Sequence, residues 1–399
     1  MNRHCNYLTK ILFGVCLLAA CTGMRAQDPL IEPEEGRTLL ERFTKGGKSI
    51  SSSSMNLQFY TSAAARFNDG SLEEAAFKLN GVRLELLGDF GKDFSYHFRQ
   101  SFNKYSNPHA LDNLSSSVEV ASVAWRMTPR FALTVGKQAI QLSGYEYWVD
   151  AIRVREFSDF NNYIECYQAG VNGAVSLSPT QTLNLQVVNN SAAKDDGAFL
   201  YGAPQDVGKV HVPVLSTLNW DGYFLNRALN MRYSVSWGEL ARKRDILYLT
   251  AGNVWEKGPV VAYVDFMYSR EGIDTKGLVS ELSASLPDGD MTAQHVSYFT
   301  TILNFDYRLH PNWNVYVKGA YETGSVYKEN GPYAKGLYRR TWNVQLCGEY
   351  FPMKNSELRI FLHLLYKNYG LTARARSLGA EGYSAQRVSL GLVYTIPVF

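Results

Sequence analysis

The residue types that most often carry catalysis or hold metals lack the spacing that such chemistry needs in this sequence. The seven histidines are scattered, and none stands in a His-Glu-x-x-His or other paired arrangement for a metal ion. No Gly-x-Ser-x-Gly, Walker-type loop or Gly-x-Gly-x-x-Gly is present. Asp288 and Asp290 could touch a cation, but the remaining ligands of a calcium loop are missing. We therefore expect no catalytic residue, no metal and no cofactor, and a protein that is not an enzyme.

The chemistry that remains is electrostatic, and the elements that would position it are strands. From Met55 onward, apolar and polar residues alternate in segments of about 8 to 14 residues, the period of a β-strand with two different faces. In one segment Trp342 and Val344 alternate with Asn343 and Gln345. One face suits lipid and the other suits water.

The connections between these segments differ in length on the two sides. Short turns, such as 128–130 and 256–259, alternate with long polar connections, such as 139–166, 191–213 and 271–294. Short turns on one rim and long loops on the other are typical of outer-membrane barrels. We predict an all-β fold, a transmembrane antiparallel β-barrel of about sixteen strands, which is wide enough for an aqueous channel.

The N-terminus has the order of a secretory signal. Arg3 and Lys10 precede the apolar run 11–20, which is too short to span a bilayer. Cleavage after Ala26 would make 1–26 a signal peptide, while Cys21 offers a rival lipoprotein-type cleavage. We interpret 27–54 as a periplasmic N-terminal segment and 55–399 as the barrel. The expected location is the cell outer membrane.

Charge and cysteine content exclude other classes. Cleavage would remove three of the 40 basic residues and none of the 37 acidic ones, so the mature chain is nearly neutral. A nucleic-acid partner is not expected, because it would need a basic surplus on one face. Only Cys166 and Cys347 would remain, enough for at most one disulfide.

The alternation also predicts which charges line the lumen, and cations outnumber acids among them. A fixed cationic wall would concentrate anions and favour their passage. The alternative is that wall charges pair with one another and keep the lumen wet. The predicted inward cations are Arg83, Arg99, Arg126, Arg232, Arg308, Lys318, Arg339, Arg359, Lys367 and Arg387, against Glu85, Asp265, Asp306, Glu322 and Glu349.

Two stretches resemble the phosphate-selective porin O and P family. They are GDFGKDFSY, residues 88–96, and FALTVGKQ, residues 131–138. The resemblance implies a sixteen-stranded barrel, usually a homotrimer, with an inward-folded third loop at the constriction and basic residues that guide anions. That loop would be 139–166, with Arg153 and Arg155 as its basic residues. It departs from a phosphate-selective pattern because it is more acidic than basic.

The expected function is that of a porin, a passive diffusion channel for small hydrophilic solutes, with phosphate or other anions as candidates. Its partners would be outer-membrane lipid, and barrel-assembly machinery that reads the terminal Phe399. The alternative is a plugged specific carrier, or a scaffold or adhesion barrel, with little open conductance. In that case residues 27–54 would sit in the lumen.

Overall fold

The computed structural model describes residues 53–104, 112, 114–192, 201–202, 204, 207–283, 292–353 and 356–398. The expected signal peptide 1–26 and nearly all of the segment 27–54 lie outside the described residues. Asp288, Asp290 and Phe399 also lie outside them.

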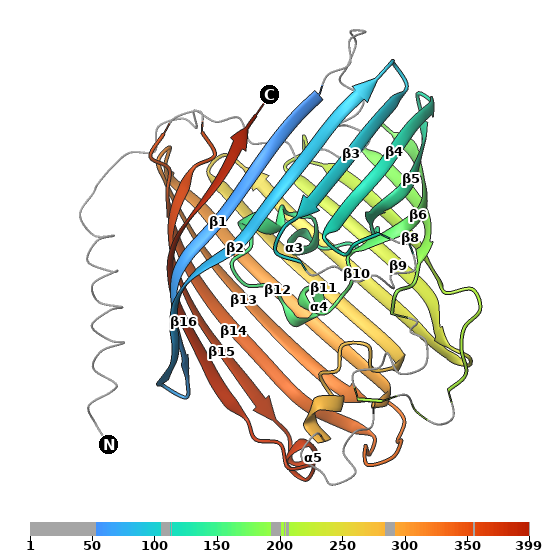
Figure 1. The fold of residues 1–399 in the computed structure, drawn as a ribbon, viewed down its shortest axis with the longest axis vertical. Coiled ribbons are helices and arrows are strands. Elements are labelled where there is room, and N and C mark those ends of the chain that lie inside the picture. Colours follow the sequence, from blue (N-terminus) through green and yellow to red (C-terminus); the bar gives the residue numbers. More distant parts are fainter. Residues whose placement is uncertain are drawn as a thin grey trace.

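The described residues form a closed barrel of sixteen antiparallel strands, which confirms the predicted fold (Figure 1). Each strand pairs with its neighbours in the sequence, and β1 closes the barrel against β16. The strands are β1 (Ser53–Asn68), β2 (Ser71–Phe90), β3 (Phe94–Ser101), β4 (Val118–Thr128), β5 (Phe131–Ala139), β6 (Tyr167–Ser178), β7 (Gln181–Asn189), β8 (Val214–Phe224), β9 (Leu229–Ala241), β10 (Arg244–Lys257), β11 (Val260–Ile273), β12 (Gln294–His310), β13 (Trp313–Val326), β14 (Gly336–Tyr350), β15 (Arg359–Leu371) and β16 (Tyr383–Pro397).

The two rims of the barrel differ as the turn lengths predict. Tight turns such as 129–130 and 258–259 lie on one rim, where β1 begins and β16 ends. The opposite rim carries most of the long connections, although β1–β2 and β9–β10 are joined there by two residues each. Short helices occur in these connections: α3 (Tyr145–Trp148), η1 (Ala151–Arg153), α4 (Asp159–Asn162), η2 (Ser280–Ser283) and α5 (Ala373–Arg376).

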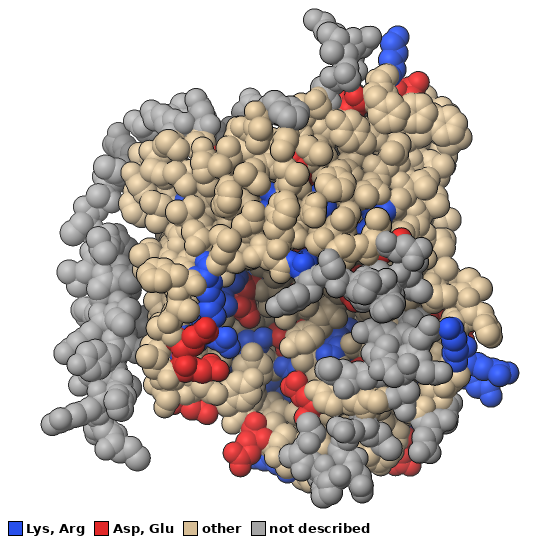
Figure 2. Space-filling model, viewed as in Figure 1, with Lys and Arg blue, Asp and Glu red and all other residues tan. Residues whose placement is uncertain are grey.

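The alternation of the sequence separates an apolar outer face from a polar inner one. On β14, Trp342 and Val344 are exposed on the outside, whereas Asn343 and Gln345 are covered inside. Figure 2 shows an outer band almost free of charge, and Lys, Arg, Asp and Glu gathered in a hollow on the loop side. Within the described part of the chain, no helix has the length and apolar character needed to cross a membrane. Cys166 and Cys347 are free thiols.

Candidate channel constriction

The connection 140–166 between β5 and β6 folds into the lumen, as the family resemblance implied for the third loop. Figure 1 shows its helices α3 and α4 inside the barrel, surrounded by the strands. The loop is fixed by two sets of contacts, one apolar and one charged, on different parts of the wall.

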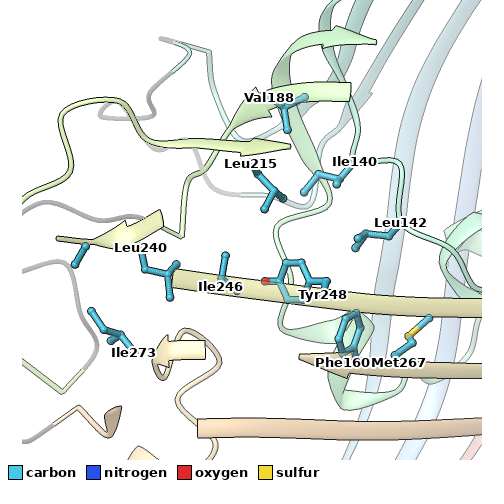
Figure 3. Packing of buried hydrophobic residues seen from close by; sticks show 11 residues of the cluster. Ile140, Leu142, Phe160, Val188, Leu215, Leu240, Ile246, Tyr248, Met267 and Ile273 are labelled. Atoms are coloured by element: carbon cyan, nitrogen blue, oxygen red, sulfur yellow. The ribbon is translucent and has the colours of Figure 1, made fainter. Parts of the chain in front are cut away.

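The apolar contacts lie against the inner faces of β7 to β11. Ile140, Leu142 and Phe160 of the loop are buried, and the Phe160 ring meets Tyr248 edge-on at 5.6 Å between centroids. Figure 3 shows these side chains pointing toward one another across the interior. Burial of apolar surface stabilises this packing without directional partners. The wall contributes Val188, Leu215, Leu240, Ile246, Tyr248, Met267 and Ile273.

Backbone hydrogen bonds attach the start of the loop to the same part of the wall. The Ser143 amide donates to Thr250 Oγ1 at 2.8 Å. The amides of Tyr145 and Glu146 donate to the two carboxylate oxygens of Asp265, at 2.8 and 2.9 Å. Wall side chains thus accept from amides that irregular backbone leaves unpaired, which would be costly to bury otherwise.

The charged contacts lie against β13 to β15. Glu146 is fully buried and pairs with Lys318 of β13 at 2.5 Å, while Ser158 and Asn161 donate to its other carboxylate oxygen. Burial opposes the charged form of Glu146, but Lys318 and these hydrogen bonds outweigh it and lower its pKa. Glu146, through its ion pair with Lys318 and its hydrogen bonds from Ser158 and Asn161, thus joins the first and last thirds of the loop to one wall strand.

Asp159, at the start of α4, bridges two wall cations. Its carboxylate accepts from Arg339 of β14 at 2.7 Å and from Lys367 of β15 at 2.6 Å. Its amide donates to Glu322 of β13 at 2.6 Å. Charge-assisted bonds of this kind are roughly twice as strong as neutral ones. Three neighbouring strands therefore hold one helix start.

The two basic residues of the loop differ in their surroundings. Arg155 pairs with Glu349 at 3.1 Å, and its guanidinium lies 4.2 Å from the centre of the Phe361 ring. Its side chain is completely covered. Arg153 meets Glu357 at 3.4 Å and keeps about a third of its side chain exposed. Arg155 thus attaches the loop to β14 and β15, whereas Arg153 faces water.

A second charged cluster joins the middle of the loop to β2, β3 and β4. Arg83 donates to Asp150 at 2.7 Å and to Glu119 at 3.2 Å, and Arg99 lies 2.8 Å from Glu119. Lys104 completes the group at 3.0 Å from Glu119. Burial opposes the ionised form of Asp150, but the Arg83 and Arg99 guanidiniums outweigh it and hold its pKa at about 2.

The other predicted pore residues also lie on the inner face. Arg232 lies over the Trp148 ring at 4.1 Å and approaches Asp221 at 3.5 Å. Arg387 pairs with Glu156 at 3.0 Å. The remaining three predictions, Arg126 near the short-turn end of β4, Arg308 near the same end of β12 and Arg359 at the start of β15, lie on the same face, and Arg359 approaches Glu349 at 3.8 Å.

Sequence reasoning missed Glu119, the centre of the β2–β4 cluster, and the apolar inner faces. Glu119 sits between Val118 and Val120, close to a register shift, where alternation gives a weak signal. The apolar inner face did leave a signal, because Ile246 to Leu249 are four consecutive apolar residues. Such a run requires apolar surroundings on both faces of β10. Among the described residues, no group of three or more His, Cys, Asp or Glu is arranged to hold a metal ion.

Solved structures with similar folds include an outer-membrane channel, a porin and a further outer-membrane protein. The channel DcaP of Acinetobacter baumannii has a TM-score of 0.61 at 12% identity, covering 88% of this chain and 99% of that one. An anion-selective porin from Comamonas acidovorans has a TM-score of 0.56 at 10% identity, covering 87% and 100%. OmpT of Vibrio cholerae, in a trimer form, has a TM-score of 0.51 at 12% identity, covering 87% and 100%. At these identities the likeness concerns the fold alone.

No curated protein matches this sequence significantly. The profile of the family described as phosphate-selective porin O and P, however, matches residues 55–396, which is nearly the whole barrel. The barrel, its inward loop and this match agree. The chain therefore belongs to the phosphate-selective porin O and P family, a family of outer-membrane diffusion channels.

Proposed function

We propose that this porin passes small hydrophilic solutes passively and prefers anions modestly. The observation that carries the proposal is the unequal exposure of paired charges. Glu119 exposes 6% of its side chain, against 14% for Arg99 and 45% for Lys104. Asp221 exposes 4%, against 18% for Arg232. Where the carboxylate lies deeper than its cation, passing ions meet the positive group first.

The preference is modest because other pairs have the opposite arrangement, and among the loop's carboxylates Asp150 has it to the largest degree. Asp150 exposes 33% of its side chain, while its partner Arg83 exposes 6%. Asp150 therefore presents negative charge to water and opposes the surrounding cations. Removing it is expected to reveal the preference that it masks.

Most of the predicted pore residues divide into two proposed roles. Arg99, Arg232 and Arg387 keep part of their guanidinium side chains exposed and would attract anions. The loop's Arg153 is also exposed, but Glu357, which exposes 40% of its side chain against 34% for Arg153, offsets its charge. A second group is nearly covered and would position the loop that narrows the lumen. This group comprises Arg83, Arg155, Lys318, Arg339 and Arg359.

Reversal potentials in asymmetric potassium chloride test the selectivity. Wild type should reverse on the anion side, Asp150→Asn should move further that way, and Arg232→Gln should move back toward zero. Asp93→Asn is the matched control, because it removes the same charge as Asp150→Asn from an exposed tight turn. A wild-type preference for cations, or equal shifts in Asp150→Asn and the control, would contradict the proposal. Block of the chloride current by added phosphate would show that phosphate binds in the lumen, and a current carried by phosphate alone would show that it passes.

The alternative of a plugged barrel depends on residues 27–54. Deleting them and recording single channels distinguishes the two. An unchanged large conductance favours the open channel, whereas a conductance that appears only after deletion favours the plug.

Assembly is the last part of the proposal. The similar fold of OmpT, solved in a trimer form, supports a homotrimer. The mass of the unboiled protein in detergent tests it.

We also propose that the barrel-assembly machinery recognises Phe399. Deleting this residue, so that Val398 becomes the new terminus, should lower the yield of heat-modifiable barrel in cells.

A further inference from the structure

A basic hollow lies on the outside of the barrel, away from the lumen. It has a volume of about 630 Å³ and lies over β13, β14 and β15 at their loop-side ends. Tyr321, Trp342 and Asn368 line it in register, since Tyr321 pairs with Trp342, and Trp342 pairs with Asn368. Tyr321 and Trp342 are each 41% exposed on the apolar outer face. The hollow therefore faces lipid.

Three guanidiniums surround this hollow. Arg340 comes from β14, and Arg374 and Arg376 come from α5, which lies beyond the loop-side end of β15. The described lining includes no Asp or Glu, and none of the three arginines forms an ion pair with a carboxylate of the described chain. Arg339, the next residue on β14, points inward and pairs with Asp159 at 2.7 Å. The inward Arg339 is thus paired within the protein, while the three arginines of the hollow have no carboxylate partner among the described residues.

The depth of the hollow corresponds to the edge of the membrane. Trp313 and Tyr350, with ring centroids 4.7 Å apart, mark the short-turn end of the apolar face, and Trp342 with Tyr366, 5.2 Å apart, marks the loop end. Arg340 stands ten residues along β14 from Tyr350. At about 3.4 Å per residue and a tilt of about 40°, this is roughly 26 Å of height, close to the roughly 25 Å of a barrel's apolar band. Arg340 therefore lies at headgroup level in the outer leaflet.

The helix α5, which carries two of the basic groups, is held in place by the fold. Thr372, which precedes α5, donates through its hydroxyl to the Leu337 carbonyl at 2.8 Å, and Ala375 is fully buried. Gly336 has a φ of 141°, and a Cβ there would come within 2.7 Å of the Arg374 guanidinium carbon. The absence of a side chain at residue 336 leaves room for that guanidinium. Positions held in this way lose little entropy on binding.

We propose that this hollow binds the phosphorylated headgroup of an outer-leaflet glycolipid of the lipid A type. Guanidiniums bind phosphate oxygens in a bidentate manner, and Arg340 and Arg374 offer two such forks at one site. The acyl chains of the same lipid would lie on Tyr321 and Trp342 below. A lipid explains both the apolar and the basic parts of the lining, whereas free phosphate explains only the latter.

Native mass spectrometry of the full mature barrel in a zwitterionic detergent tests the proposal with purified lipid A as the probe. Arg340→Gln with Arg374→Gln should lower lipid A occupancy at least tenfold, and Arg340→Lys with Arg374→Lys should retain part of it. Arg66→Gln with Lys78→Gln is the control, because it removes two cations near the loop-side rim that already pair with Glu74. The control should bind lipid A like wild type.

Each other result has a definite meaning. Equal occupancy in the glutamine pair and the wild type, with both samples heat-modifiable and hence folded, overturns the proposal. Displacement of lipid A by millimolar inorganic phosphate would make this a site for the free ion, and loss of oligomers without loss of lipid would make it an interface between copies. Monophosphoryl lipid A, which has one phosphate fewer, should bind more weakly than lipid A, and equal binding would count against recognition of the phosphates.

Discussion

The two sides of the lumen hold the same loop by different forces. Against β7 to β11, Phe160 and its neighbours are buried in a dry apolar cluster. Against β13 to β15 and β2 to β4, the loop's carboxylates Glu146, Asp150 and Asp159 meet wall cations. The first side combines burial with hydrogen bonds from loop amides to Thr250 and Asp265, while the second depends on ion pairs.

The difference separates stability from selectivity. Apolar packing does not respond to salt or to proton concentration in the working range, so it fixes where the loop lies. Charged pairs do respond to both, and they set the potential that a passing ion meets. A variant on the apolar side should therefore leave the selectivity largely intact.

Phe160→Ala should have the largest effect on stability. The Phe160 side chain is 1% exposed, and removing a buried ring of this size typically costs about 3 to 5 kcal/mol because a cavity remains. Thermal unfolding in detergent should occur at lower temperature, and single-channel current should become noisier as the loop loosens. The reversal potential should change little. A stable, quiet channel would contradict an apolar anchor.

Lys318→Met should lower the stability by a smaller amount, and a second substitution should partly reverse the loss. It leaves the buried Glu146 carboxylate without its cation, and we expect a loss of about 2 to 3 kcal/mol, below the 3 to 5 typical of dry interiors because lumen water can enter. Adding Glu146→Gln should restore part of that loss. Unfolding of both single variants and the double variant measures the coupling. Strict additivity would mean that the pair contributes nothing.

Alternation in the sequence was sufficient to predict the barrel and the inward direction of residues such as Lys318 and Arg339. Period two fixes the face of each strand residue once one face is buried in lipid. It does not identify partners. Asp159 and Arg339 are 180 residues apart in the chain, and irregular loop backbone brings them together. The sequence showed an excess of acids in the loop, but it predicted no pairing between the loop and the wall.

Acid should loosen the contacts of the loop on the charged side. The pKa of Asp150 is about 2 in the folded chain, below the roughly 3.9 of an unperturbed aspartate. Its ionised form therefore stabilises the fold fully above pH 4, and that contribution is lost as the pH falls toward 2. Wild-type conductance should become unstable over this window, while Asp150→Asn should change less between pH 5 and pH 2 than wild type, because Glu146 still titrates in the variant. Identical pH profiles would show that another group is responsible.

Salt should have the smallest effect, and it should act on selectivity alone. The Debye length falls from about 10 Å at 0.1 M to about 3 Å at 1 M, so exposed groups such as Arg232 act over a shorter range. The anion preference should weaken across this interval, and the difference between wild type and Arg232→Gln should shrink with it. Conductance divided by bulk conductivity should approach a constant at the upper end, because Phe160 and the apolar cluster keep the loop in place. If that ratio instead rises steeply near 1 M, salt has loosened the loop, and the ion pairs rather than the apolar packing hold the constriction.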